Sequence, residues 1–236
     1  MKNNPFANIK WVFFDLGNTL IDETSARRHL LKQIAMRLSH EEFTTAPERI
    51  ESALAAAFAR FCPEPWESAL EGFVADVGQA CQILQDIPYP KYLEQPYPAT
   101  QSLLAGLEHR GFRLGVLANQ SLGTESRLRE YGIGRYFSCC LSSAEVGFAK
   151  PDMNLFRLAE EAAGCSGREL LMIGDRLDND IRPARVRGWA TIRIKQGLAE
   201  AQQPRDSLDE PDASCYNLEA VVGLLGVSAT KCTPQR

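Results

Sequence analysis

The chain has 236 residues and a formal net charge of −4, and 44% of its residues are hydrophobic. This length is enough for one large or two modest domains, and the hydrophobic share is enough to form a sizeable core. The acidic balance argues against a nucleic-acid-binding surface, although it leaves room for one small phosphate in a cleft.

The longest apolar runs are far too short to cross a membrane, and the first five residues lack the apolar core of a secretory signal. The seven cysteines include no Cys-x-x-Cys pair, and no histidine lies near enough to them to suggest a zinc site. We therefore expect a cytoplasmic protein with reduced thiols and no membrane partner. The sequence carries no signal for an oligomeric state.

The first predicted strand ends abruptly at a carboxylate. Residues 11–14 are four consecutive apolar residues, which is typical of a strand buried on both faces of a parallel sheet, and Asp15 follows directly. Open α/β sheets bind their ligands at this carboxyl end of the strands. The plainer interpretation is that Asp15 only caps a turn, because Asp-x-Gly-Asn is also good turn chemistry.

Residues 22–96 show helical spacing and no strand pattern. The apolar residues predict one helix carrying Leu30 to Leu38, a second behind a capping box at Thr45–Glu48, and a third from about Trp66 to Leu84. The aromatic residues among them are expected to form the core of this helical unit. A proline-rich segment, residues 87–98, is expected to lead back to the first domain.

From residue 99 the pattern alternates between helix and strand. Strands are predicted at residues 112–117, 139–141, 170–173 and 190–194, and helices lie around 103–107, 124–131, 151–163, 179–187 and 218–225. Residues 199–214 are predicted to be loop, and from Val227 onward the chain has little to bury and is expected to be loose. This alternation predicts an α/β fold in which helices cover both faces of a parallel sheet.

Right-handed crossovers bring the carboxyl ends of such strands to one edge, where several charged residues are then expected to meet. Asp15 follows the first strand, Lys150 precedes a helix, and Asp175, Asp178 and Asp180 follow the strand at 170–173. Carboxylates gathered at one point repel one another, and a divalent cation relieves the repulsion. Oxygen ligands select a hard ion, so we expect Mg²⁺, which together with a lysine makes a site for a phosphoryl oxygen.

Each of these residues also has a plainer interpretation. Lys150 taken alone is a typical solvated surface lysine, and Asp178-Asn179-Asp180 taken alone is a typical acidic start of a helix. The order in which they occur along the chain, each at the end of a predicted strand or the start of a helix, favours a common site.

In this arrangement the chain resembles the haloacid dehalogenase superfamily. The residues that carry the resemblance are Phe14 to Leu20, then Lys150-Pro151, then Gly174-Asp175 with Asp180, and they match three of the four family motifs across residues 10–36 and about 97–225. The resemblance implies a Rossmann-like core, residues 1–21 and 97–236, with an inserted all-helical cap, residues 22–96. We expect this cap to set substrate choice.

The resemblance also implies catalytic roles. Asp15 would be the nucleophile that forms an aspartyl-phosphate, and Lys150 would offset charge between Asp15 and the phosphoryl group. Mg²⁺ would be held by Asp15, by the backbone carbonyl of Gly17 and by Asp175, and Asp178 or Asp180 would hold its waters. Because a halide-releasing enzyme needs no metal, the acids after the fourth strand favour phosphate-ester hydrolysis of a small metabolite.

Two positions depart from the family pattern. Family phosphatases carry a second Asp, a general acid and base, where this chain has Gly17. The family's Ser or Thr at the end of the second strand is replaced by Ala118, and a small shift in alignment would let Asn119 or Ser121 bind the phosphoryl group instead. Asp22 and His29 are further candidates for the missing acid.

Two functions therefore fit the sequence. One is a phosphatase whose leaving group needs little protonation, such as an aryl, acyl or anomeric phosphate. The other is a catalytically weak or inactive relative that binds a phosphorylated ligand or a protein partner.

Overall fold

The computed structural model describes residues 4–39 and 45–226, and the chain divides into two compact units. The first unit comprises residues 1–21, 96–196 and 204–236. The second comprises residues 22–95 together with residues 197–203, a segment that the sequence analysis assigned to the core. The short strands β2 (Ile21–Asp22) and β3 (Gln95–Pro96) pair with each other where the chain passes between the units.

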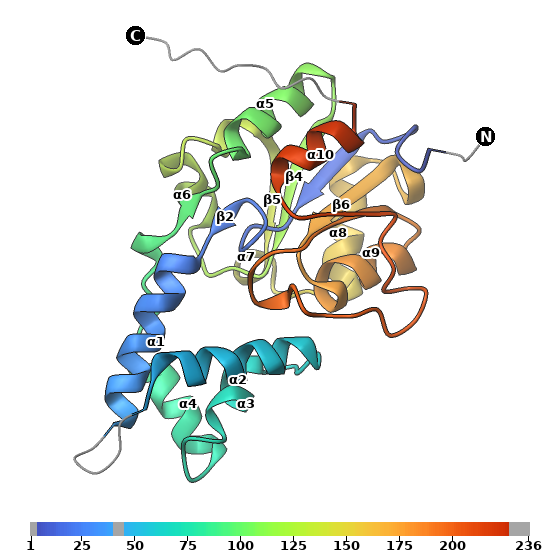
Figure 1. Cartoon of the computed structure of the whole chain (residues 1–236). Coiled ribbons are helices and arrows are strands. Elements are labelled where there is room, and N and C mark those ends of the chain that lie inside the picture. The colour runs from blue at the N-terminus through green and yellow to red at the C-terminus, as the bar shows by residue number, and fades with distance from the viewer. Residues whose placement is uncertain (1–3, 40–44, 227–236) are drawn as a thin grey trace. The chain divides into compact units, whose positions relative to one another are not determined.

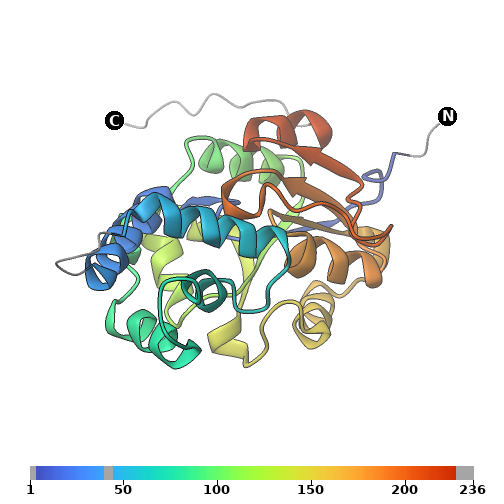
Figure 2. The ribbon, with the colours of Figure 1, turned by 60° about the horizontal axis from the view of Figure 1, so that its bottom comes forward.

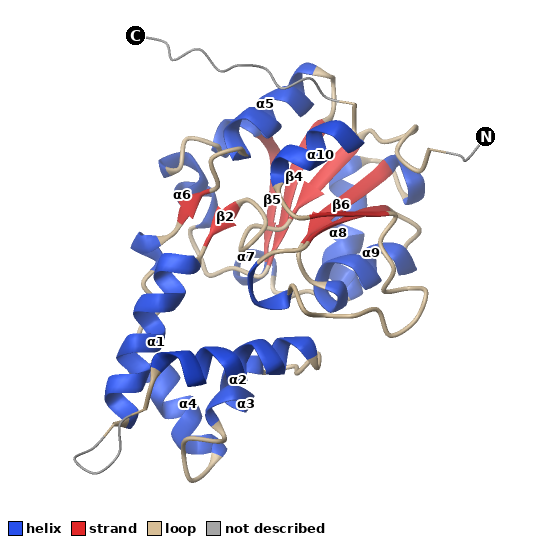
Figure 3. Cartoon of the chain, in the orientation of Figure 1, coloured by secondary structure: helices blue, strands red, loops and turns tan. Residues whose placement is uncertain are grey.

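The first unit is built on a six-stranded sheet in which all neighbouring strands are parallel, and Figure 3 draws its strands in red. The strand order is β5-β4-β1-β6-β7-β8, so β1 lies inside the sheet between β4 and β6. This confirms the predicted α/β fold with a parallel sheet. The strands are β1 (Trp11–Phe14), β4 (Arg113–Ala118), β5 (Phe137–Ser142), β6 (Leu170–Gly174), β7 (Ala190–Ile194) and β8 (Ala213–Cys215).

Helices cover both faces of this sheet. Figures 1 and 2 show α5 and α10 on one face and α8 and α9 on the other. The helices of this unit are α5 (Thr100–His109), α6 (Thr124–Glu130), the short α7 (Ser143–Val146), α8 (Met153–Ala163), α9 (Arg182–Val186) and α10 (Leu218–Leu224).

The side chains of β1 alternate between the two faces of the sheet. Val12 and Phe14 belong to the cluster that includes residues of α5 and α10, whereas Trp11 and Phe13 belong to the cluster with residues of α8. All four are buried, and burying one large apolar side chain stabilises the fold by about 1.5–3 kcal/mol. This burial on both faces holds the strand that carries Asp15 rigidly in place.

The second unit is formed mainly by four helices. They are α1 (Thr24–Leu38), α2 (Pro47–Ala59), α3 (Pro65–Leu70) and α4 (Val77–Asp86), and they share one hydrophobic core that includes Leu31, Ile34, Ile50, Leu70 and Ile83.

Two local predictions in this unit were wrong. The capping box at Thr45 does not form, because Pro47 is the first helical residue and favours an extended residue before it, so that Ala46 becomes the N-cap. The single helix predicted from Trp66 is two helices, because Asp76 accepts a hydrogen bond from the Gln79 amide at 2.9 Å and begins a new helix there.

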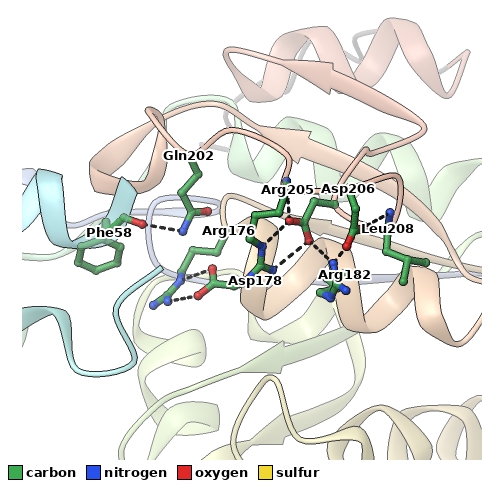
Figure 4. A network of polar contacts seen from close by, with 9 residues as sticks. Phe58, Arg176, Asp178, Arg182, Gln202, Arg205, Asp206 and Leu208 are labelled. Carbon is green, nitrogen blue, oxygen red and sulfur yellow. Dashed lines mark hydrogen bonds and ion pairs between the residues drawn. The ribbon is translucent and has the colours of Figure 1, made fainter. Parts of the chain in front are cut away.

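Residues 197–203 belong to the second unit through specific contacts. Gln202 is completely buried, and its side-chain amide donates to the carbonyl oxygen of Phe58 at 3.0 Å, as Figure 4 shows. Ala199 is buried in the same segment. Periodicity did not reveal this attachment because a single buried glutamine leaves no pattern.

Strand β8 was missed, since residues 199–214 were all predicted to be loop. Three consecutive residues are too short for a period-two signal. The prediction for residues from Val227 falls outside the described residues. Within the described part of the chain, no helix is both long and apolar enough to cross a membrane.

A buried carboxylate, Asp209, anchors the loop that precedes β8. Asp209 is fully buried and accepts hydrogen bonds from the side chains of Arg205 and Arg182, and from the Arg205 backbone amide. Burial by itself raises the pKa of a carboxyl group, but these arginine contacts outweigh it and lower the pKa of Asp209 to about 2. Arg182 is the first residue of α9, so the loop is fastened next to the turn after β6.

We predict that Asp209→Asn lowers the free energy of unfolding by about 2 kcal/mol at pH 7, because hydrogen bonds to two guanidinium groups lose their charge assistance. Since the folded-state pKa is depressed, this stabilisation is present above pH 4 and is lost as the pH falls toward 2. Urea unfolding across this range measures it. Asp206→Asn is the matched control, because this exposed carboxylate contacts the same Arg182 and its loss should change stability little. Equal effects of the two variants would contradict the prediction.

Candidate active site

The site begins at the carboxyl end of β1. The backbone amide of Asp15 still donates to the carbonyl oxygen of Ile173 at 2.9 Å, so Asp15 continues the alignment of β1 with β6. The chain passes from β1 to one side of the sheet for β4 and β5, and later to the other side for β6 and β7. Open α/β sheets bind their ligands where the strand order reverses in this way.

Lys150 lies at the centre of the site. Its Nζ is 2.5 Å from Oδ1 of Asp15 and 2.6 Å from Oδ1 of Asp180. The lysine and Asp180 side chains are buried, whereas Asp15 remains 13% exposed. Burial disfavours the charged ammonium, but the two carboxylates outweigh this effect and raise the pKa of Lys150 above its ordinary value. The lysine therefore carries a positive charge at neutral pH.

A third carboxylate joins this pair. One oxygen from each of Asp15, Asp175 and Asp180 lies within 4.8 Å of the other two. Burial, together with the neighbouring carboxylates, raises the pKa of Asp175 well above its ordinary value, and burial likewise raises that of Asp180 to about 6. Three carboxylates thus face one ammonium group, which leaves two negative charges to be balanced.

This arrangement fits a divalent cation. The donor atoms are carboxylate oxygens, which suit hard ions such as Mg²⁺, and the unbalanced charge equals that of one such ion. The raised pKa values of Asp175 and Asp180 fit this interpretation. Burial and the neighbouring carboxylates make these carboxyl groups retain protons more strongly when no cation is bound. Asp15, Asp175 and Asp180 are therefore the residues able to hold the ion.

Asp180 reaches the cluster through an unusual backbone turn. Residues Leu177–Ile181 form a π-helical turn directly before α9, and the amide of Arg176 donates to Oδ2 of Asp180 at 2.9 Å. Gly174 makes room for this side chain, since a Cβ atom at that position would lie 2.4 Å from Cγ of Asp180. The glycine before Asp175 is thus a steric requirement of the cluster.

Asp178 does not join the cluster. Its carboxylate accepts hydrogen bonds from Nε and Nη2 of Arg176, at 3.1 and 2.6 Å (Figure 4). The sequence left open whether Asp178 or Asp180 would hold the waters of the metal, and the geometry brings Asp180 to the carboxylate cluster. The pairing of Arg176 with Asp178 was not predicted, although an arginine two residues before an acid is a visible signal.

Asn119 follows β4 and contacts the lysine segment. Its Oδ1 accepts a hydrogen bond from the Lys150 amide at 2.6 Å, and its Nδ2 donates to the Lys150 carbonyl at 2.9 Å. β4 ends at Ala118, which is fully buried, so the side chain at the end of this strand is a methyl group. Ser121 lies in the exposed loop beyond it. Substrate binding by Asn119 stays a prediction.

The loop after Asp15 turns tightly. The Asn18 amide donates to the Ile21 carbonyl at 2.8 Å, and Asn18 adopts a left-handed conformation with φ of 52°. Gly17 forms a bridge with Ile21 at this turn, and its role as a backbone metal ligand stays a prediction. The two other candidate acids have local partners: Asp22 accepts from the Thr24 amide, and His29 contacts Gln33.

Comparison with known proteins gives consistent matches. A model of the haloacid dehalogenase-like hydrolases matches residues 9–188. The chain is 30% identical over 219 residues to a glyceraldehyde 3-phosphate phosphatase of Methanopyrus kandleri, which covers 86% of this chain and 91% of that protein. It is 27% identical to a phosphoserine phosphatase of Thermus thermophilus, with 90% and 98% covered. A putative phosphatase structure from Clostridium difficile has a TM-score of 0.71 at 19% identity, covering 92% and 99%, and supports the fold.

We predict that Mg²⁺ raises the melting temperature of the native protein at pH 7.5 and less at pH 5.5, because protons compete for Asp175 and Asp180. Without metal, stability should fall as the pH rises from about 4 to about 6, since a raised carboxyl pKa favours the folded state only while the proton is bound. Asp175→Asn should raise the metal-free melting temperature and remove the Mg²⁺ response. Thermal scans with and without Mg²⁺ measure both effects.

Asp178→Asn is the control for this experiment, because it removes a carboxylate from the same turn but outside the cluster. It should keep the Mg²⁺ response. An unchanged response in Asp175→Asn would show that the ion binds elsewhere.

Proposed function

The chain belongs to the haloacid dehalogenase-like hydrolases, and we propose that it is a Mg²⁺-dependent phosphatase acting on a small phosphorylated metabolite. The observation that carries the proposal is the contact of Lys150 with Asp15 and Asp180, beside Asp175. A phosphoryl group needs a nucleophile and positive charge around its oxygens, and this cluster supplies a carboxylate, an ammonium group and the donors for a cation.

Each residue has a distinct role in the proposal. Asp15 is the nucleophile: one carboxylate oxygen attacks phosphorus, the ester oxygen leaves, and water then hydrolyses the aspartyl-phosphate. Lys150 contacts Asp15 and neutralises charge on the phosphoryl oxygens. Asp15, Asp175 and Asp180 would hold the cation, together with the backbone carbonyl oxygen of Gly17. When bound, Mg²⁺ supplies positive charge to the phosphoryl group.

Two considerations favour phosphate over halide chemistry. The buried acids Asp175 and Asp180 leave a charge imbalance that suits a metal, whereas halide release needs none. The names of the relatives refer to glyceraldehyde 3-phosphate and phosphoserine, which are small phosphorylated metabolites. We propose the same substrate class for this chain, and we propose that the helical segment 22–96 is the cap that selects among its members.

The cluster lacks a means of proton transfer to the leaving group. Gly17 stands where family phosphatases have their general acid, and such an acid contributes about 10²–10⁴-fold. Alkyl esters such as those named for the relatives need this proton most. We therefore propose that the protein works best on esters whose leaving group is already stable as an anion.

We predict that the native protein hydrolyses p-nitrophenyl phosphate or acetyl phosphate only with Mg²⁺, and that Asp15→Asn abolishes turnover because an amide is not a nucleophile. A colorimetric phosphate assay across a panel of phosphorylated metabolites measures it. Asp152→Asn, which alters an acid at the start of α8, is the control and should keep activity. Binding of phosphorylated ligands without turnover would favour the inactive relative instead.

A second prediction concerns the missing acid. Gly17→Asp should raise kcat for alkyl phosphates more than for aryl phosphates, because only an alkoxide leaving group needs strong protonation. Paired measurements of kcat on glyceraldehyde 3-phosphate and p-nitrophenyl phosphate test this. Equal gains on both substrates would rule out proton transfer as the limiting deficiency.

A further inference from the structure

We propose that Asn119 is a positioning residue that holds the backbone of Lys150, and through it the ammonium group, at the acidic cluster. The inference deepens the proposed function by assigning this side chain to the lysine rather than to the substrate. It rests on two hydrogen bonds between residues that are 31 positions apart in the chain.

The two bonds make a clamp that only a carboxamide can supply. The Asn119 side chain accepts from the Lys150 amide at 2.6 Å and donates to the Lys150 carbonyl at 2.9 Å. A carboxylate has no proton to donate, and a hydroxyl cannot span both groups of one residue. The reverse placement of the amide would set donor against donor and acceptor against acceptor, so the hydrogen-bond pattern itself fixes the orientation.

Such a clamp suits Lys150 because its backbone lies in a turn outside the helices and strands. It lies between α7 and α8, and regular helix begins only at Met153. A lysine side chain has four rotatable bonds and loses conformational freedom when its end is fixed. Here the ammonium group must contact Asp15 and Asp180 together, so fixing the backbone at the base of the side chain removes one source of displacement.

Asn119 is well placed for this task. It follows Ala118, the last residue of β4, and β4 pairs directly with β1, which carries Asp15. The nucleophile and the clamp are therefore attached to two adjacent, buried strands. The distance between Asp15 and the lysine is thus set by the register of the sheet rather than by a free loop. A displacement of about 1 Å in such a group can lower a rate 10²-fold.

The competing role is direct contact with substrate, since Nδ2 has a second proton besides the one given to Lys150. The two roles differ in kinetics. Loss of a positioning group lowers kcat with little change in KM, because the misplaced lysine no longer stabilises the transition state, whereas loss of a substrate ligand raises KM.

The kinetic test compares Asn119→Ala and Asn119→Asp with native protein. Positioning predicts that kcat falls about 10- to 100-fold with KM within threefold, and that Asn119→Ala has no further effect on kcat in a Lys150→Ala background. A raised KM at unchanged kcat, or additive losses in the double variant, would overturn the proposal. Asn217→Ala is the control: it removes an asparagine that caps α10 and should leave both constants unchanged.

A second measurement is independent of catalysis. Lys150 is 5% exposed, so brief acetylation with an N-hydroxysuccinimide ester, mapped by mass spectrometry, should barely modify it in native protein. Asn119→Ala should increase acetylation at Lys150 several-fold while exposed lysines such as Lys10 keep their rates, and Asn217→Ala should not. Unchanged protection in Asn119→Ala would overturn the proposal. Absence of Mg²⁺-dependent turnover in native protein would instead reject the phosphatase function and leave this labelling result to decide the clamp.

Discussion

The candidate site depends on one ion-pair arrangement, in which a buried lysine contacts two carboxylates that come from distant parts of the chain. Lys150 brings one positive charge to Asp15 and Asp180, and Asp175 adds a third negative charge beside them. In a buried environment such charges interact strongly, and partial neutralisation leaves the cluster with an affinity for a further cation. Burial, together with the neighbouring carboxylates, raises the pKa values of Asp175 and Asp180, and the unbalanced negative charge makes the site suitable for Mg²⁺.

The rest of the first unit serves to hold these groups at fixed distances. β1 is buried on both faces, β6 lies beside it, and the backbone of Asp15 is bonded to β6. The turn after β6 determines which acid joins the cluster. Gly174 leaves space for the side chain of Asp180, whereas Asp178 pairs with Arg176 and stays outside the cluster. Asp209 then anchors the following loop to Arg182, immediately behind that turn.

In the proposed function, the site supplies the electrostatic part of phosphoryl transfer, and Gly17 provides no side chain for proton transfer. Gly17 has no side chain, and buried Ala118 has no hydroxyl, so neither position contributes a polar side chain to the site. The charged groups around Asp15 belong to Lys150, Asp175 and Asp180, so they do not depend on Gly17 or Ala118. We propose that the absence of these polar groups narrows the range of leaving groups, since it concerns side-chain atoms of the site and not the strands that carry it.

The sequence by itself determined the parallel α/β fold and the order of the charged motifs. Continuous apolar runs such as residues 11–14 indicate buried strands. Right-handed crossovers then place Asp15 and Asp175 at the same edge of the sheet, where the strands end. Only the tertiary structure decided which acid joins the cluster, because Asp178 and Asp180 differ just by the path of a π-helical turn and the partner Arg176. It also revealed the contact of Asn119 with Lys150 and the attachment of residues 197–203 to the helical unit. These contacts join residues far apart in the chain through single polar side chains, which leave no periodic signal in the sequence.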